Sequence, residues 1–349
     1  MTNTTVRSDV APPEVALLRL LLDDPRFDPD DVDWSVMLEL AQRQGLTLRL
    51  ADWFARRHEG VPAPIAEAFA AARQRQGWLL ALVARLEERC ARFDIPHVFL
   101  TVAQQYPDLG RDIDLLVDGS PRDVDAALLD WSVPQVQRRG VRDRLAATTC
   151  YPLPEYGANL VIQHRRMGRM GEHGRFAWRL LHRRRRVRLA EVSWSAPAPE
   201  HGLLVLMLHR LYGQPSLRLR DAHWTITTLR RPDFNWDLLW DAAHAIGVLD
   251  GLSCYLNYIE QIHLQVMGAP LVPGEVRRTE PKSAWGQVEL RDGNYRFAQA
   301  RVAGKLYFRE FCADLAAGNW DAAGRLLCLP VVAAAAGYKR LTQPVEQGA

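Results

Sequence analysis

One apolar segment with two embedded carboxylates constrains the fold of this chain more than any other feature. It reads Arg111-Asp112-Ile113-Asp114-Leu115-Leu116-Val117 and lies between Gly110 and Gly119. The apolar run bounded by glycines predicts a buried strand. Because side chains alternate across a strand, Asp112 and Asp114 are predicted to point to the same face.

Two carboxylates this close repel each other unless a cation lies between them. Mg²⁺ prefers carboxylate oxygens together with substrate phosphates. A bound Mg²⁺ polarises a phosphoryl group and helps to generate an attacking oxyanion. Asp112 and Asp114 are therefore candidate magnesium ligands and catalytic residues. The competing interpretation, a solvated acidic pair at a strand end, would be preferred if the motif stood alone.

The surrounding sequence predicts a unit of strands and helices. Residues 96–100 predict a strand before the motif, and Ser120 is expected to cap a helix after it. Weaker strand patterns occupy residues 133–136, 159–163 and 187–192. Strands mixed with helices over about 100 residues indicate an α/β or α+β unit.

Helical spacing dominates on both sides of this unit. Upstream, Asp33 is expected to cap a helix over residues 34–44 that Gly45 ends. Downstream, Asn235 or Asp233 is expected to cap one of several helices. The expected helices cover residues 13–22, 34–44, 48–54 and 65–90, and then 203–212, 219–229, 236–246, 252–266, 295–315 and 320–341. We therefore predict an α+β protein with a helical region 1–93, an α/β core 94–195 and a helical region 196–349.

This pattern resembles the core of the nucleotidyltransferase superfamily, and more narrowly a bacterial family of uncharacterised nucleotidyltransferases. The resemblance rests on the Asp112–Asp114 strand, the preceding Tyr106-Pro107 pair, and the segments Ser195–Leu204 and Leu208–Leu211. It covers most of residues 35–265. It implies a small mixed sheet of nucleotidyltransferase type between helical regions.

The resemblance also implies an activity, namely Mg²⁺-dependent transfer of a nucleoside monophosphate from an NTP to a small-molecule or protein acceptor. By position, Thr101 and Arg111 are expected to bind the nucleotide, and His164 matches a histidine of the family's later strand and is expected among the catalytic residues. Arg165 and Arg166 follow that strand and are expected to bind phosphate, because a guanidinium pairs with phosphate in a bidentate manner.

Two departures from the family pattern leave an alternative open. Residues 100–103 contain no glycine, and Thr101 replaces the family's lysine where superfamily members place a turn whose amides approach the triphosphate. Ile162 is expected at the position of the third carboxylate, which normally serves as general base or metal ligand. The alternative is an altered or inactive nucleotidyltransferase fold that serves as an accessory protein, or as the catalyst of a different reaction, in bacterial biosynthesis.

Composition restricts the compartment and the partners. Five scattered cysteines without a CxxC pair fit a reducing cytoplasm, and no apolar stretch is long enough for a membrane span. The run Arg183–Arg186 has no interleaved aromatic residue, so it is interpreted as a solvated loop or strand edge. A nucleic-acid-binding module built on it is a weaker alternative. His209 and Asp221 are interpreted as structural polar contacts.

Overall fold

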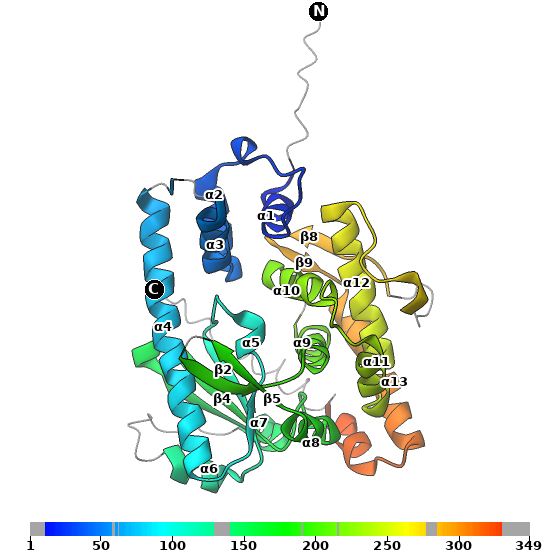
Figure 1. Cartoon of the computed structure of the whole chain (residues 1–349). Helices are drawn as coiled ribbons and strands as arrows, with labels where there is room; N and C mark the ends of the chain where they lie inside the picture. Colours follow the sequence, from blue (N-terminus) through cyan, green and yellow to red (C-terminus); the bar gives the residue numbers. More distant parts are fainter. Residues whose placement is uncertain are drawn as a thin grey trace, which may run out of the picture.

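A four-stranded mixed sheet lies between helices in the computed structural model of the chain (Figure 1). The structure describes residues 11–57, 60–61, 63–128, 140–189, 191–214, 216–276 and 285–329. This architecture confirms the predicted α+β class, with helical regions on both sides of the sheet in sequence. No helix in these ranges is both long enough and apolar enough to cross a membrane.

The central sheet has the strand order β1-β2-β4-β3. β2 runs parallel to β4 and pairs Asp112 with Asn159 and Asp114 with Val161, while the outer strands are antiparallel to their neighbours. The four strands are β1 (His97–Phe99), β2 (Asp112–Val117), β3 (Thr148–Leu153) and β4 (Ala158–His164).

One face of this sheet packs against the C-terminal half of α4 (Ala63–Arg92) and against α6 (Pro121–Leu128). Every second residue of β2 and β4 belongs to this core, because strand side chains alternate between faces. Glu87 fastens α4 to the sheet: Nε2 of His97 lies 2.8 Å from its carboxylate, and the amide of Ser195 donates to it over 3.0 Å. α4 therefore shares its core with the strands.

The opposite face carries Asp112, Asp114 and Leu116. Leu116 belongs to a second and larger core, in which α8 (Gly174–His182) and α9 (Pro199–Gly213) cover the sheet. The first three helices pack into the same core as the C-terminal helices (Figure 1). The remaining members are α1 (Pro13–Leu21), α2 (Trp34–Gln44), α3 (Thr47–Arg57), α10 (Leu219–Leu229), α11 (Trp236–Ala245), α12 (Leu249–Met267) and α13 (Gln299–Ala316).

Local capping explains several helix boundaries that the sequence predicts. The carboxylate of Asp33 accepts hydrogen bonds from the amides of Ser35 and Val36, and Gly45 ends α2 with a left-handed φ of 65°. Asn235 caps α11 through the amide of Leu238. Ser120 and Asp123 bond reciprocally at the start of α6. These caps confirm the predicted starts of α2, α6 and α11, and the end of α2.

The structure differs from the predicted elements in several places. The pattern at 187–192 is a hairpin of β5 (Arg185–Leu189) and β6 (Val192–Ala196), so Arg185 and Arg186 belong to a strand. The predicted helix at 295–315 begins only at Gln299, because Tyr295 lies in a strand. Neither β3 nor a three-stranded sheet of β7 (Ser216–Arg218), β9 (Asn294–Arg296) and β8 (Glu289–Arg291) was expected. The predicted strand at 133–136 lies outside the described residues, and residues 320–329 are helical.

The minor elements complete the described chain. They are the short helices α5 (Val102–Gln105) and α7 (Val141–Ala146), and the 3₁₀ turns η1 (Pro29–Asp31), η2 (Pro154–Tyr156) and η3 (Gly274–Val276).

Candidate functional site

Asp112 and Asp114 lie on the face of β2 that points toward α9. Asp112 is exposed at the start of the strand, and Asp114 is half-buried. Each carboxylate accepts one hydrogen bond from a neighbouring element: Thr101 Oγ1 donates to Asp114 over 3.0 Å, and Asn159 Nδ2 donates to Asp112 over 2.9 Å. The two side chains are thus held on one side of the sheet.

The electrostatic environment of Asp114 favours a nearby cation. Burial raises the pKa of this carboxyl group, and the charge of Asp112 raises it further. His209 and the hydrogen bond from Thr101 oppose that increase. A positive charge between the two aspartates would relieve both the burial cost and the repulsion.

Two helices of the C-terminal region close the cleft above Asp114. A cavity of about 200 Å³ is lined by both aspartates together with His209 and Arg210 of α9 and Asp221 of α10. Nε of Arg210 lies 2.7 Å from Asp221 in a buried ion pair. Burial, with the charge of Arg210, lowers the pKa of His209. The wall opposite the sheet is therefore polar, and an ion pair joins the two helices that form it.

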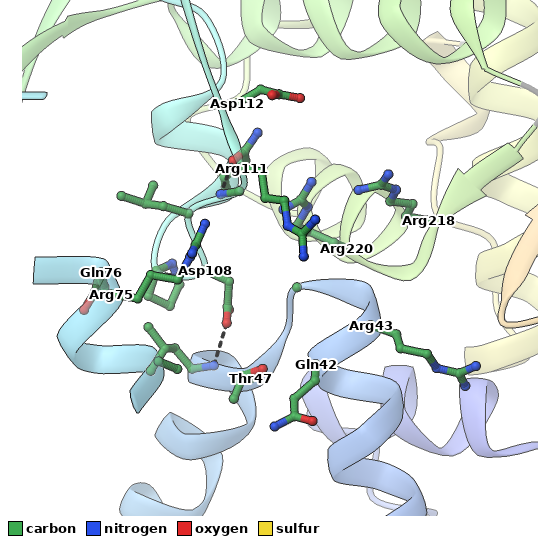
Figure 2. A pocket seen from close by; sticks show the side chains of 17 residues that line it. Gln42, Arg43, Thr47, Arg75, Gln76, Asp108, Arg111, Asp112, Arg218 and Arg220 are labelled. Atoms are coloured by element: carbon green, nitrogen blue, oxygen red, sulfur yellow. Dashed lines mark hydrogen bonds between the residues drawn. The ribbon is translucent and has the colours of Figure 1, made fainter. Parts of the chain in front are cut away.

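A larger cavity of about 640 Å³ continues from Asp112 toward the N-terminal helices. Five of its lining residues are arginines, and two are aspartates. Figure 2 shows Arg111, Arg218 and Arg220 along one wall beside Asp112, and Gln42, Arg43 and Thr47 on the opposite wall. Arg75 of α4 lines the same space. The cleft thus combines a carboxylate pair with a strongly cationic extension.

The loop that joins α5 to β2 is anchored beneath this cavity. Asp108 accepts hydrogen bonds from the amides of Leu48 and Arg49 at the start of α3, over 2.6 and 3.2 Å. The guanidinium of Arg49 bonds to the same carboxylate at 3.1 Å and to the carbonyl oxygen of Tyr106 at 2.5 Å. These contacts fix the approach of the chain to Arg111 and Asp112.

Of the residues singled out in the sequence, Thr101 and Arg111 lie at this cleft with the two aspartates. His164, Arg165 and Arg166 lie at the far end of the parallel strands. The register pairs His164 with Val117, five steps from Asp112, or about 17 Å at ~3.3 Å per residue. Arg165 pairs with Asp118 at 2.5 Å, and Arg166 pairs with Asp321 at 2.6 Å.

His164 has a buried structural environment. Its Nε2 lies 3.0 Å from the hydroxyl of Thr149, and its Nδ1 lies 3.1 Å from the carbonyl oxygen of Gly119. Both ring nitrogens therefore have partners within the core. The structure does not bring His164, Arg165 or Arg166 together with the carboxylate pair.

The structure does not place Ile162 beside the carboxylate pair. Ile162 pairs with Leu115 and is fully buried in the core under α4, on the face opposite the aspartates. The β4 residues on the face of Asp112 and Asp114 are Asn159, Val161 and Gln163, because paired residues of adjacent strands point to the same side. None of them supplies a third carboxylate.

Several cleft residues were not expected from the sequence. Arg218 and Arg220 were not expected among the site residues, and His209 was interpreted as a structural polar contact. The alternation of the two arginines with leucines in Leu217–Asp221 is a local signal that could have marked them. Their position at the cleft depends on how α9 and α10 pack against the sheet.

The family comparison agrees with this geometry. The sequence profile of a family described as "Uncharacterised nucleotidyltransferase" matches residues 30–263 of the 349. The chain belongs to this family. The matched segment includes the strand of Asp112 and Asp114 and both helices that face it, α9 and α10. A comparison with curated proteins finds no match.

The residues of the cleft fit a divalent cation that is shared with a phosphate substrate. Within the described residues, no three His, Cys, Asp or Glu side chains are arranged to hold a metal by themselves. Mg²⁺ commonly takes only one or two carboxylates and completes its coordination with water and substrate phosphates. Asp112 and Asp114 match that requirement, and the adjacent arginines match the phosphates.

Proposed function

We propose that this protein transfers a nucleoside monophosphate from an NTP to a small-molecule or protein acceptor in a Mg²⁺-dependent reaction. The proposal depends on one observation above the others: the paired carboxylates of the family's strand open into a cleft whose extension is lined by arginines. This is the charge arrangement that a metal-bound triphosphate requires.

The reaction is an in-line displacement at the α-phosphorus. An acceptor oxygen forms a bond to that phosphorus, the bond to the bridging oxygen of the β-phosphate breaks, and pyrophosphate leaves. The acceptor proton passes to solvent or to a basic group. Mg²⁺, when bound, polarises the phosphoryl group and neutralises charge on the leaving group.

Each side chain of the cleft has its own role in this reaction. Asp112 and Asp114 would hold the cation, and the hydroxyl of Thr101 orients Asp114 while lining the cavity beside the two carboxylates. Arg111, directly before the strand, binds the nucleotide. Positioning and charge stabilisation account for most of the catalysis in phosphoryl chemistry of this kind.

The test is Mg²⁺-dependent NTP turnover in the full chain. The purified protein is incubated with each α-labelled NTP, in Mg²⁺ or in EDTA, with a deproteinised cell extract as the source of acceptors. Labelled product and pyrophosphate are expected in Mg²⁺ only. Asp114→Asn is expected to abolish them while the circular dichroism spectrum and melting temperature stay close to those of the parent.

A matched control uses a carboxylate of the same strand region. Asp118→Asn changes an exposed carboxylate that pairs with Arg165 beyond the far end of β2, and it should leave turnover unchanged. Turnover in Asp114→Asn equal to that of the parent would contradict the proposal.

A second candidate is a nucleotidyltransferase fold that binds nucleotide without transferring it. It is favoured by Asn159 and Val161, which occupy the metal-facing side of β4 where a third carboxylate would stand. The same assay separates the candidates. Mg²⁺–NTP binding by calorimetry, without labelled product from any nucleotide, would favour the second.

A further inference from the structure

A buried arginine lines both cavities without a protein partner. Arg220 is 7% exposed, and within the described part of the chain its guanidinium makes no hydrogen bond or ion pair. Burial, with the charges of nearby arginines, lowers its pKa to about 10, so it stays protonated at neutral pH. A buried cation without a counter-ion is costly unless a ligand supplies the missing charge.

The carboxylates near Arg220 are already engaged. Asp221 attracts it, but that carboxylate forms the buried ion pair with Arg210. Asp108 is engaged by Arg49 and by the amides at the start of α3. The cavity therefore keeps an excess of positive charge next to Asp112.

Two further guanidinium groups share this cavity with Arg220. Arg111 precedes β2, and Arg218 ends β7; both are exposed to solvent, and neither side chain has a hydrogen bond or ion pair to another described residue. Figure 2 shows all three along the same wall. A guanidinium offers paired donors that match phosphate oxygens, so three converging arginines suit a polyphosphate better than a single anion.

The position of Arg220 is set by the turn between α2 and α3. A Cβ atom at Gly45 would lie 3.0 Å from Nη1 of Arg220 and 3.6 Å from its Cδ, so the glycine turn lets the arginine lie flat against the backbone. The N-terminal helices thus hold a side chain of α10 in place. The packing of the fold therefore determines the position of this arginine in the cavity.

The alternative phosphate position, after β1, is poorly equipped. The α5 helix there has only four residues, which gives a small dipole, and its sequence has no glycine to bring amides close to an anion. The hydroxyl of Thr101 already donates to Asp114. The arginine cavity is the stronger anion site of the two.

We infer that the cavity of Arg111, Arg218 and Arg220 binds the polyphosphate chain of the nucleotide, through side-chain guanidinium groups in place of backbone amides. The assignment of the anion to a nucleotide rests on the proposed function; the polyphosphate site itself does not. The volume of about 640 Å³ lies within the usual range for small-molecule sites. The N-terminal helices, the sheet and α10 all contribute to its walls.

The experiment measures binding of inorganic tripolyphosphate to the full chain by calorimetry, in EDTA. The parent is expected to bind it, and binding should weaken as salt is raised. Arg218→Gln and Arg111→Gln change exposed side chains, so both variants should fold. Each is expected to weaken binding by about tenfold or more, as the loss of a charge-assisted hydrogen bond predicts.

Arg220→Gln is expected to have the largest effect, with its melting temperature as a check on folding. Arg165→Gln is the matched control, because it removes an equally charged, exposed arginine at the other end of β4 and should leave the affinity unchanged. Equal affinity in the parent, Arg218→Gln and Arg111→Gln would overturn the inference, as would an equal loss in Arg165→Gln.

The outcome of the binding experiment does not depend on the outcome of the transfer assay. Tripolyphosphate binding without NTP turnover would support the polyphosphate site and count against the transfer proposal. Turnover that persists in Arg218→Gln and Arg111→Gln with an unchanged KM would keep the transfer reaction, but it would remove this site and the nucleotide-binding role of Arg111.

Discussion

The side-chain amide of Asn159 donates a hydrogen bond to Oδ1 of Asp112 over 2.9 Å, across two parallel strands. A neutral amide thus stands beside the exposed carboxylate on the side of the sheet that faces the cleft. The amide stabilises the carboxylate of Asp112 by a hydrogen bond and adds no charge of its own. It also marks the position where one substitution would create a three-carboxylate site.

Asn159→Asp is expected to make the fold more dependent on a divalent cation. The new carboxylate faces Asp112 directly, which costs about 1 kcal/mol in EDTA because like charges on paired strand positions repel. Mg²⁺ should restore that stability, so the rise in melting temperature on adding Mg²⁺ should be larger than in the parent. Thermal unfolding of both proteins with and without Mg²⁺ measures this rise in melting temperature.

Asn159→Ala is the control, since it removes the hydrogen bond without adding a charge. Its response to Mg²⁺ should equal that of the parent. An Asn159→Asp variant that gains nothing from Mg²⁺ would show that this face of the sheet does not hold the cation.

Asp108→Ala is expected to destabilise the protein by about 3 kcal/mol, because it leaves a buried guanidinium without its counter-ion and uncaps α3. The side chains of Asp108 and Arg49 are 6% and 10% exposed, so solvent replaces little of the lost interaction. Urea unfolding followed by circular dichroism measures the change.

The double variant of Asp108→Ala with Arg49→Met tests that reason. It should be less destabilised than the sum of the single variants, because no unpaired charge remains. Strict additivity, or a loss below about 0.5 kcal/mol in Asp108→Ala, would contradict the role given to this pair.

The limits of the sequence predictions follow from the range of the interactions involved. Neighbours within a few residues determine the strand of Asp112 and Asp114, the shared face of the two carboxylates and the cap at Asp33, and these were predicted. For α11 the sequence left Asn235 and Asp233 as alternative caps, and the structure has Asn235. Strands β7 and β9 are three residues long and pair across about 80 positions, so no local pattern marks them.

The position of Ile162 shows how sensitive a face assignment is to register. A shift of one residue moves a strand side chain to the opposite face, and only the pairing of Asp114 with Val161 decides which residue stands beside the carboxylates. The grouping of the cavity arginines likewise depends on contacts between residues far apart in the sequence. Arg111 and Arg220 are 109 positions apart in the sequence, and packing of α10 against the N-terminal turn brings them to one wall.

His164→Ala is expected to lower the free energy of unfolding by about 2–3 kcal/mol, from the lost packing and two lost hydrogen bonds. The kcat and KM for NTP should not change, because the imidazole lies at the far end of β4 and bonds to Thr149 and Gly119. Denaturant unfolding and steady-state kinetics on the same preparation measure both quantities.

Thr149→Val provides the matched comparison. It removes one partner of His164 while keeping the shape of the buried side chain, and a loss of about 1 kcal/mol is expected. A large fall in kcat for His164→Ala, with unfolding close to that of the parent, would instead assign the histidine to catalysis.

The stability of the protein should depend on pH through Glu310 of α13. Its side chain is 2% exposed, and within the described residues Oε2 has no hydrogen-bond partner, while Oε1 lies 3.2 Å from Nδ1 of His173. Burial, followed by the charges of Glu172 and Asp314, raises the pKa of Glu310 well above its ordinary value of 4.5. The folded state therefore binds a proton that the unfolded state releases.

The sign of the effect follows from this difference. Above pH 4.5 the unfolded chain loses the proton first, so the contribution of Glu310 to stability falls as pH rises until the folded-state pKa is passed. Glu310→Gln removes that dependence. The variant should match the parent near pH 4 and become more stable than it as pH rises, by up to roughly 1.4 kcal/mol per pH unit.

Urea unfolding of both proteins at several values between pH 4 and pH 8 measures the difference. Burial also lowers the pKa of His173, but that histidine is present in both proteins, so its own burial cost largely cancels in the comparison. Glu88→Gln, at an exposed position of α4, should show no such trend. A difference between Glu310→Gln and the parent that stays constant across this range would show that Glu310 is already ionised in the folded protein.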